Sequence, residues 1–367
     1  MRSLISSAIH YLDKESDPEK PEDAGHSITC DDRNRMPLMK GGEPVQKPGI
    51  LVVGCGGTGH SVINRLFHTG FSGPQTMVID HDLLTFDHCH ASIPFLLKSS
   101  YFRHDDLCVL EGHPDIVATA MENACPDLDK KVGDPDLCII IAGMSGNAGT
   151  GSAPVIARLA KARGSTVMAL VTLPSRLEKS RYSRAGKGLE ALLQAADSVY
   201  VLDLNCLLKM TPENLPFRYV YSTADQLLAD IVRNLYECVC TPSMVNLEFA
   251  DLIHITGRGG YGTILVGETL EPNFVEGVSR DCRNNWMGDI PHSAMTGCIV
   301  FIEGYYCGLF YSEEIAAGIC LGMDPRADVI RGVHEDHTMP EGEMRAYALV
   351  STGKKDTRGR SRKNAGF

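Results

Sequence analysis

The feature that most constrains this chain is a glycine-rich loop at residues 142–154, between an apolar run at 137–141 and a helical pattern at 155–161. The apolar run has the length and isoleucine content of a strand, so the order is strand, glycine loop, helix. Four glycines between residues 143 and 151 let the backbone fold back and turn its N–H groups inward. Pro154 suits the first turn of a helix. The positive end of that helix therefore faces the loop, and such an arrangement binds phosphate.

A second glycine turn lies where the folded part of the chain begins. The continuous apolar run at 50–53 predicts a strand buried on both faces, and residues 54–59 follow it with four glycines. A helical pattern and a strand that ends at Asp80 complete a strand–helix–strand unit. The glycine spacing alone matches a dinucleotide-binding fingerprint, with Asp80 where a ribose-binding acid would sit. Strands and helices alternate up to Asp203, which predicts a doubly wound parallel sheet with both glycine loops at the carboxyl ends of its strands.

Composition limits the classes of function. The net charge of −11 argues against a nucleic-acid footprint over the body of the protein. The apolar runs are shorter than the roughly 18 residues of a membrane span. Residues 1–12 lack the apolar core of a signal peptide, so we expect a cytoplasmic protein without a transmembrane segment. The thirteen cysteines include no Cys-x-x-Cys pair, so we predict reduced thiols and no metal site within the chain.

The sequence pattern divides the chain into five parts. Residues 1–47 form a polar N-terminal extension, expected to be mobile or loosely docked, whose opening residues could form one or two helical turns. Residues 48–222 form a nucleotide-binding domain, 223–242 a central helix with an apolar stripe, 243–353 a smaller α+β domain and 354–367 a basic tail. The extension or the tail could contact an adaptor protein.

Three local predictions depend on shorter patterns. Thr223 and Gln226 have the spacing of a capping box, which places the start of the central helix at Thr223. Residues 309–311 are predicted as a strand before a helical segment at 313–318. Residues 83–135 show little regular pattern, so no long element is predicted there.

An acidic loop (residues 246–251) follows the central helix and carries Asn246, Glu248 and Asp251. A water molecule that attacks a phosphate needs a positioned carboxylate and usually a metal ion. If the long helix separates this loop from the glycine loops, its carboxylates act on a neighbouring molecule. The chain contains no P-loop motif. The patterns therefore indicate phosphate chemistry outside the P-loop class.

The order of these motifs resembles the FtsZ branch of the tubulin superfamily. The resemblance rests on residues 54–59, 142–155, 171–178 and 246–251, and it covers residues 48–353. It implies the tubulin/FtsZ fold, GTP and GDP as ligands with Mg²⁺, and a cytoskeletal GTPase of cell division or cell shape. It also implies head-to-tail homopolymers, called protofilaments, in which the acidic loop of one subunit completes the GTPase site of the next.

The resemblance assigns roles to residues at matching positions. Those that would line the phosphates are Gly57, Thr58, Gly59, His60, Gly146, Asn147, Ala148, Gly149 and Thr150. Those that would lie near the ribose, the phosphates or the guanine base are Glu178, Arg181, Asp225 and Gln226, with Asp225 and Gln226 as alternatives at the base. Those that would orient or deprotonate the attacking water are Glu248 and Asp251, with Asn246 in support.

The second glycine loop departs from the Gly-Gly-Gly-Thr-Gly-Thr-Gly that is typical of the family, because Ser145 and Asn147 replace two glycines and Ala148 replaces a threonine. Asn147 carries a Cβ that would narrow the space for phosphate, and Ala148 donates no side-chain hydrogen bond. One alternative is therefore a scaffold that does not hydrolyse GTP and has altered or lost nucleotide binding. Another alternative, a Rossmann dinucleotide enzyme or an adenylating enzyme, rests on residues 50–82 alone.

Overall fold

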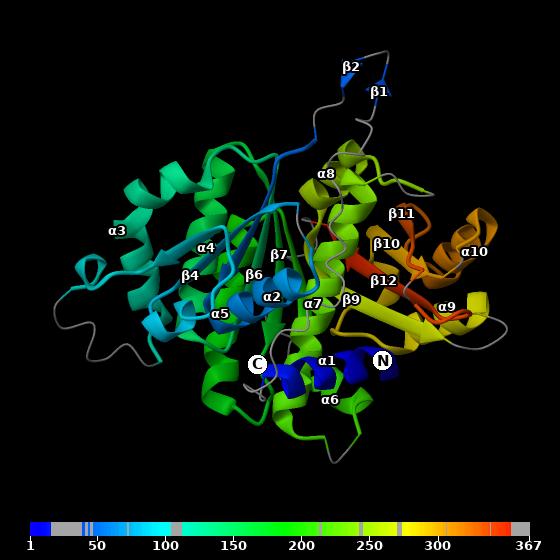
Figure 1. The fold of residues 1–367 in the computed structure, drawn as a ribbon, viewed down its shortest axis with the longest axis horizontal. Helices are drawn as coiled ribbons and strands as arrows, with labels where there is room; N and C mark the ends of the chain where they lie inside the picture. The colour runs from blue at the N-terminus through cyan, green and yellow to red at the C-terminus, as the bar shows by residue number, and fades with distance from the viewer. Residues whose placement is uncertain are drawn as a thin grey trace.

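One sheet runs through the whole molecule (Figure 1). This computed structural model describes residues 1–15, 39–40, 43–44, 47–71, 73–103, 112–212, 215–241, 245–269, 274–305, 307–337 and 339–353. The ten strands of the sheet are β3 (Ile50–Cys55), β4 (Gln75–Asp80), β5 (Ile93–Leu96), β6 (Leu137–Gly143), β7 (Thr166–Leu173), β8 (Ser198–Asp203), β9 (Gly260–Thr269), β10 (Gly297–Gly304), β11 (Asp328–Glu335) and β12 (Met344–Ser351). Their order is β11-β10-β12-β9-β8-β7-β6-β3-β4-β5. β12 is antiparallel to both of its neighbours, and all other pairs in this sheet are parallel.

Helices cover both faces of the sheet. Those on the face of the central helix are α1 (Arg2–Glu15), α2 (Gly56–His68), α6 (Leu204–Met210), α7 (Phe217–Cys240) and α8 (Phe249–Arg258). Those on the opposite face are α3 (Pro114–Val132), α4 (Asn147–Ala162), α5 (Lys179–Ala195), α9 (Phe274–Asn284) and α10 (Leu309–Ile319). The smaller elements are the strands β1 (Met39–Lys40) and β2 (Glu43–Pro44) and the 3₁₀ turns η1 (Leu83–Phe86), η2 (Ser99–Tyr101) and η4 (His292–Ala294). Of the described helices, none combines the length and the apolar character needed to cross a bilayer.

Neighbouring residues along the central strands belong to opposite cores, because side chains alternate between the two faces of a strand. In β3, Val52 packs on the α7 side and Val53 packs on the side of α3, α4 and α5. Both side chains are fully buried. Helices on both faces therefore explain why the strand sequences are continuous apolar runs rather than alternating ones.

The predicted α/β fold class, with its parallel sheet, long central helix and smaller C-terminal α+β part, is confirmed. The C-terminal part does not form a sheet of its own, because β8 and β9 pair in parallel from Ser198 with Gly260 to Val201 with Thr263. The sequence changes there from alternating strands and helices to an α+β pattern because β12 runs antiparallel between β9 and β10.

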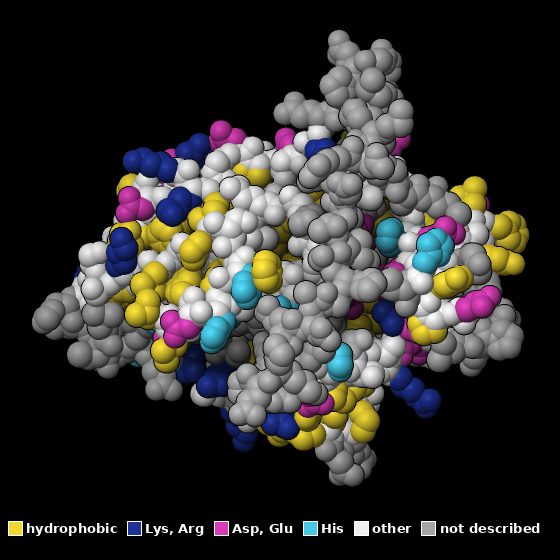
Figure 2. All heavy atoms as spheres, in the orientation of Figure 1, with side chains coloured by type: hydrophobic (Ala, Val, Ile, Leu, Met, Phe, Trp, Pro, Cys, Tyr) yellow, Lys and Arg dark blue, Asp and Glu magenta, His cyan; other side chains and the backbone are white. Residues whose placement is uncertain are grey.

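Four local predictions are wrong. α4 begins at Asn147, so Pro154, which was predicted in the first turn, lies inside the helix. α7 begins at Phe217, and Thr223 lies inside it, where its hydroxyl donates to the Tyr219 carbonyl at 2.7 Å and caps nothing. Residues 309–311 are the first turn of α10, and their apolar side chains are exposed. Figure 2 shows hydrophobic side chains at its right edge, where Figure 1 places α10. The poorly patterned residues 83–135 contain the 19-residue helix α3, whose pattern is weakened by an internal proline.

The N-terminal helix α1 packs against α7. Ala8 is fully buried, and its carbonyl accepts a hydrogen bond from the Ser222 hydroxyl of α7 at 3.0 Å. The expectation of a mobile or loosely docked extension over residues 1–47 is therefore wrong for the stretch that forms α1, because its apolar stripe has a partner on α7. Residues 16–38 and the basic tail at 354–367 lie outside the described residues.

Candidate functional site: a glycine cradle at the carboxyl edge of the sheet

Two helices begin side by side at the carboxyl edge of the sheet, since α2 follows β3, α4 follows β6, and these two strands are paired. The N-caps are Cys55 and Gly146, and neither supplies a side-chain hydrogen bond to its helix. The free N–H groups and positive ends of both helices therefore face one surface. We call the surface formed by residues 56–60 and 145–150 the glycine cradle. Such a surface attracts phosphate.

The inner glycines of this region allow the two loops to pack backbone against backbone. A Cβ on Gly56 would lie 2.8 Å from the Gly149 backbone nitrogen, and a Cβ on Gly59 would lie 2.9 Å from the Ile141 carbonyl oxygen. Gly56 has a φ of +71°, which side chains with a Cβ rarely adopt. Any larger residue at these positions would force the two loops apart.

The outer glycines of the cradle face open space instead. A Cβ on Gly57 or Gly146 would meet no heavy atom of the described chain within 4 Å, and both residues are exposed. The neighbouring Thr58 and Asn147 are partly exposed. The cradle thus offers uncapped helix ends around an open surface that a Cβ would partly fill. These residues fit a phosphate-bearing ligand such as a nucleotide.

The structure brings the phosphate-lining residues predicted from the sequence to this one edge. Ala148 is buried, and its Cβ lies 3.2 Å from the position that a Cβ on Gly56 would take, so it points toward α2. Asn147 is the first residue of α4 and keeps part of its surface exposed. The His60 ring lies against Asn64, with 3.0 Å between His60 Nε2 and Asn64 Nδ2. Ser145, the third departure from the family pattern, is partly exposed like Asn147, so only Ala148 is turned away from the open surface.

Glu178 links the start of α5 to the first turns of α7. One of its carboxylate oxygens accepts a hydrogen bond from Arg181 Nη1 at 2.7 Å, and the other accepts one from the Tyr221 hydroxyl at 2.6 Å. Burial raises the pKa of the Glu178 carboxyl, but these hydrogen bonds outweigh burial and hold that pKa below its ordinary value. Tyr221 is a residue of this region that the sequence analysis missed. Its place one helical turn before Asp225 is the signal that could have found it.

Gln226 lies inside the protein, with 8% of its surface exposed. Its Oε1 accepts a hydrogen bond from Arg65 Nη1 at 3.1 Å, and its Nε2 donates to Asp230 Oδ1 at 3.0 Å. Both ends of the amide are thus used inside the protein, which argues against the expected contact of Gln226 with guanine. Asp225 is partly exposed and stays the candidate for the base. The sequence does not show which of Asp225 and Gln226 faces the base. Adjacent helix positions point in directions about 100° apart, so the answer depends on how α7 is oriented in the fold.

The acidic loop lies at the opposite, amino edge of the sheet. Asn246, Glu248 and Asp251 are all exposed. Gly259, at the end of α8, packs against Ser198, the first residue of β8. Figure 1 shows α6 near one end of α7 and α8 near the other. The 24 residues of α7 span about 36 Å, so one chain does not bring its acidic loop and its glycine cradle together.

Among the described residues, no group of three or more His, Cys, Asp and Glu side chains is placed to hold a metal ion. A Mg²⁺ ion at a nucleotide site takes most of its ligands from phosphates and water. The sheet, the cradle and the long helix define the class: an α/β protein without a P-loop, whose glycine loops and uncapped helix ends suit a phosphate-bearing ligand.

Comparison with known proteins gives the family. Residues 49–212 match the GTPase-domain model of the Tubulin/FtsZ family. The chain is 35% identical over 305 residues to cell division protein FtsZ 2 of Halobacterium salinarum, which covers 83% of this chain and 76% of that protein. It is 34% identical over 306 residues to FtsZ 2 of Methanocaldococcus jannaschii, which covers 82% of this chain and 79% of that protein. The chain therefore belongs to the FtsZ branch of the tubulin/FtsZ family.

Solved structures share this architecture. An empty FtsZ dimer from M. jannaschii is similar with a TM-score of 0.77 and 29% identity, over 83% of this chain and 88% of that chain. CetZ2 from Haloferax volcanii, solved as a protofilament with GTPγS, is similar with a TM-score of 0.67 and 16% identity, over 84% of this chain and 94% of that chain. The CetZ2 likeness supports the fold alone. The family membership confirms the resemblance and removes the dinucleotide or adenylating alternative, which accounted only for residues 50–82.

Proposed function

We propose that this protein binds GTP in the glycine cradle and hydrolyses it in head-to-tail filaments, where the acidic loop of one subunit completes the cradle of the next. The observation that carries the proposal is the placement of two half-sites at opposite edges of one sheet. The cradle residues 56–60 and 145–150 include no carboxylate, and the acidic loop holds two exposed ones. A second copy stacked along the direction of α7 would bring the two half-sites together.

The chemistry of each half-site fits its part in phosphate hydrolysis. The uncapped ends of α2 and α4 donate N–H groups to the phosphates, and Gly57 and Gly146 leave room for them. Mg²⁺ bound to the phosphates supplies positive charge against the charge that develops during hydrolysis. Glu248 and Asp251 of the neighbouring subunit orient the attacking water and accept its proton, with Asn246 in support.

The sugar and base lie next to the cradle in this proposal. Arg181, hydrogen-bonded to Glu178, binds the sugar–phosphate end of the nucleotide. The ionised Glu178 carboxylate accepts hydrogen bonds from ribose hydroxyls. Asp225 faces the base, since Gln226 is turned into the protein interior.

Phosphate release by purified protein with GTP and Mg²⁺ tests the shared site. We expect the rate to rise more than in proportion to protein concentration, because only stacked subunits have a complete site. A rate per subunit that stays constant over the concentration range would contradict the mechanism.

Mixing two inactive variants tests it more sharply. Asp251→Ala removes a carboxylate but leaves the cradle, and Gly146→Val fills the cradle but leaves the acidic loop. We expect each variant alone to lose turnover and Asp251→Ala to keep GTP binding. A mixture should recover activity at junctions that combine an intact cradle with an intact acidic loop. Glu313→Gln on α10, an exposed carboxylate outside both half-sites, is the control and should keep full activity. A mixture without activity would exclude a shared site.

The partly exposed Asn147 favours a second candidate function, a scaffold that assembles without hydrolysing nucleotide. Its Cβ stands at the start of α4, where the family has glycine. Identification of the nucleotide released on denaturing the purified protein separates the two functions. Released GDP supports the GTPase, and an empty protein that does not take up GTP supports the scaffold.

A further inference from the structure

The N-terminal helix α1 lies across α7, and its two ends are held by two further parts of the fold (Figure 1). Leu4 and Ala8 of α1 are 3% and 0% exposed. Leu4 belongs to the same hydrophobic core as Val220 and Leu227 of α7. The apolar face of α1 is therefore part of the protein interior, although α1 is joined to the rest of the fold only through its own contacts.

The first turn of α1 is capped by a carboxylate from the C-terminal half of the sheet. Glu268, near the end of β9, accepts a hydrogen bond from the Ser3 backbone N–H at 3.2 Å and another from the Ser3 hydroxyl. The first N–H groups of a helix have no partner within the helix, so a carboxylate at this end stabilises it. Glu268 is itself held in place, because its backbone N–H donates to Asp281 of α9 at 3.1 Å. One end of α1 is therefore attached to β9.

The other end of α1 covers a buried cation of α2. The ring of Tyr11 lies over the Arg65 guanidinium group, with 3.9 Å between Arg65 Cζ and the ring centroid. Arg65 is 1% exposed, and it donates hydrogen bonds to Gln226 Oε1 at 3.1 Å and to Ser222 Oγ at 2.6 Å. The attraction between a cation and an aromatic face is stronger when the cation is removed from water. Tyr11 therefore helps to bury the cation that joins α2 to α7.

The Ser222 hydroxyl connects the three helices at a single oxygen. It accepts the hydrogen bond from Arg65 of α2, it belongs to α7, and it donates to the Ala8 carbonyl of α1 at 3.0 Å. Ser222 is 3% exposed. If α1 moved away, water would enter the contact between α2 and α7 at Ser222 and Arg65. The position of α1 is thus coupled to the contact between these two helices.

The helices that α1 holds also form part of the candidate site. The first turn of α2 forms one half of the glycine cradle. Ser222 lies between Tyr221, which donates a hydrogen bond to Glu178 at 2.6 Å, and Asp225, the candidate for the base. A shift of α2 or of the first turns of α7 would therefore change the candidate site, although α1 itself contributes no residue to it.

We infer that α1 is a strap that is attached to β9 at one end and to α2 at the other, and that holds the start of α7 between them. A helix of 14 residues is a rod of about 21 Å, so its two ends are released together. An attached strap keeps α2, α7 and the C-terminal half of the sheet in one arrangement. A detached strap loosens all three. The strap does not depend on nucleotide, whereas its effect on nucleotide binding rests on the proposed function.

Hydrogen exchange of the full chain, measured by mass spectrometry, tests the detached state. Ala8→Glu places a carboxylate in the buried contact with α7, and Ser7→Glu places the same group on the exposed side of α1 as the matched control. We expect residues 56–68, 217–226 and 264–269 to exchange about tenfold faster in Ala8→Glu than in Ser7→Glu. If only residues 1–15 exchange faster, α1 is docked but holds nothing, and the strap is refuted.

A double-mutant cycle with milder variants gives a second test, which does not depend on the folding of Ala8→Glu. Tyr11→Ala removes the ring over Arg65, and Glu268→Gln removes the charge that caps the other end of α1. Ser3 and Tyr11 lie about 12 Å apart along α1, so independent contacts would give additive shifts of the denaturation midpoint. The strap predicts a double variant whose shift is clearly smaller than the sum, because the release of one end weakens the contact at the other. Additive shifts would overturn it.

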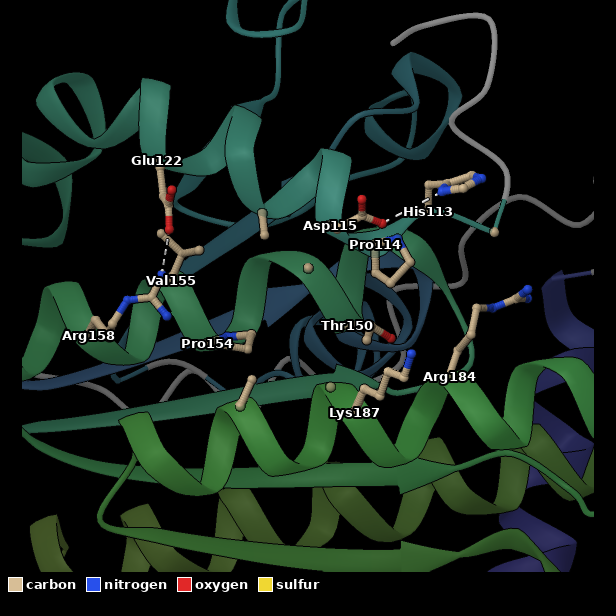
Figure 3. A pocket seen from close by; sticks show the side chains of 15 residues that line it. His113, Pro114, Asp115, Glu122, Thr150, Pro154, Val155, Arg158, Arg184 and Lys187 are labelled. Carbon is tan, nitrogen blue, oxygen red and sulfur yellow. Dashed lines mark hydrogen bonds and ion pairs between the residues drawn. The ribbon is translucent and has the colours of Figure 1, made fainter. Parts of the chain in front are cut away.

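Glu122→Gln provides the charge-matched control for this cycle. Figure 3 shows Glu122 of α3 paired with Arg158 of α4, at 2.9 Å, in a cleft of about 570 Å³ on the other face of the sheet. Since neither residue contacts the strap, the midpoint shifts of Glu122→Gln and Tyr11→Ala should add. If this control pair deviates from additivity as much as Glu268→Gln with Tyr11→Ala, the deviation does not come from α1, and the strap is refuted.

Titration with GTPγS tests the consequence for the candidate site. We expect Tyr11→Ala to bind GTPγS about fivefold more weakly than the wild type, and Ser7→Ala, on the exposed side of α1, to bind it equally well. If the wild type does not bind GTPγS, the GTPase proposal fails alone, and hydrogen exchange and the midpoints still decide on the strap. If Tyr11→Ala binds GTPγS as the wild type does, the link between the strap and the candidate site is refuted.

Discussion

The glycine cradle and the interface between α7 and strands β10 and β12 are both polar, but they are built in opposite ways. The cradle places no charged side chain inside the protein, and it consists of glycine backbone and uncapped helix ends. The interface is a network of buried charges. Its centre is Glu303 of β10, which is 1% exposed and accepts hydrogen bonds from the Tyr347 hydroxyl at 3.1 Å and from Asn234 Nδ2 at 3.0 Å.

The interface contains its own counter-charges. Arg233 Nη2 lies 3.3 Å and Arg345 Nη1 3.6 Å from the carboxylate oxygens of Glu303. Asp230 lies beside them on α7 and connects through Gln226 to Arg65 of α2. The cradle, in contrast, leaves its positive helix ends for a ligand to neutralise. The cradle therefore leaves its positive charge for a ligand to neutralise, whereas the interface contains both signs of charge within the folded chain. Two buried atoms of the interface, Arg233 Nε and Asn234 Oδ1, still have no hydrogen-bond partner among the described residues.

The largest effect is expected from opening the network. Glu303→Ala leaves the guanidinium groups of Arg233 and Arg345 without their buried carboxylate, which should lower the free energy of unfolding by about 3–5 kcal/mol. Chemical denaturation measures the loss. Glu303→Gln retains hydrogen-bonding groups for Tyr347 and Asn234 and should cost clearly less. Equal losses in the two variants would show that the hydrogen bonds of Glu303 contribute little beside its charge.

The next effect depends on pH and on Asp230. Burial raises the pKa of the Asp230 carboxyl to about 6, against an ordinary value of 3.8, and Arg233 opposes that shift. The folded state thus holds this proton more tightly than the unfolded state. The stability contributed by this group is fully present below pH 3.8 and is lost as the pH rises through about 6.

The free energy of unfolding of the wild type should therefore contain a decline on the order of 2 kcal/mol between about pH 4 and pH 7. Asp230→Asn should lack that decline. Denaturation curves of both proteins across this pH range give the difference directly. Parallel pH profiles would show that Asp230 does not titrate differently in the two states.

A smaller effect is expected from crowding the inner backbone of the cradle. Gly149→Ala places a Cβ 2.6 Å from the Gly143 carbonyl oxygen of its own loop and 3.1 Å from the Cys55 carbonyl oxygen of the other, so the loops must shift. Overpacking of this kind costs about 1–3 kcal/mol. The midpoint and slope of a denaturation curve measure it, together with GTP binding, which should also fall. Unchanged stability would show that the two loops move apart freely.

The smallest effect on stability is expected at the outer surface of the cradle. Gly146→Ala adds a Cβ to open space, so the free energy of unfolding should change by no more than about 0.5 kcal/mol. GTP affinity should nevertheless fall, since the added methyl group occupies the space proposed for phosphate. Titration of both Gly146→Ala and Gly149→Ala with GTPγS separates the role of the outer glycines from that of the inner glycines. If Gly146→Ala destabilises as much as Gly149→Ala, the division into inner and outer glycines is incorrect.

Much of the fold was predictable because its signals are local. Continuous apolar runs marked the buried strands β3 and β6, and glycine turns after them marked the helix starts of α2 and α4. Helix α3 was missed because its apolar positions are diluted by polar residues and a proline. The docking of α1 was missed because it depends on α7, whose buried Ser222 lies 214 residues along the chain from Ala8.

The candidate site, like the fold, was predictable where its signals are local. The residues of the cradle follow from the sequence, because a glycine indicates that the backbone at its own position needs conformational freedom or close approach. The inward turn of Gln226 does not, since it depends on Arg65, which lies 161 residues away. Tyr221 has only the local signal of its spacing from Asp225, since its partner Glu178 lies at the start of another helix, α5.

The sequence by itself determined the order of strands, glycine loops and helices, because these follow from backbone freedom and from hydrophobic spacing along a short stretch. Only the tertiary structure decided which glycines are crowded and which are open, since that depends on two loops meeting. It alone decided that Glu303 and Asp230 are buried, with Tyr347 reaching Asp230 across 117 residues of sequence. Charged residues on a helix or a strand look solvent-exposed in a sequence, and only folding supplies the distant partners that allow their burial.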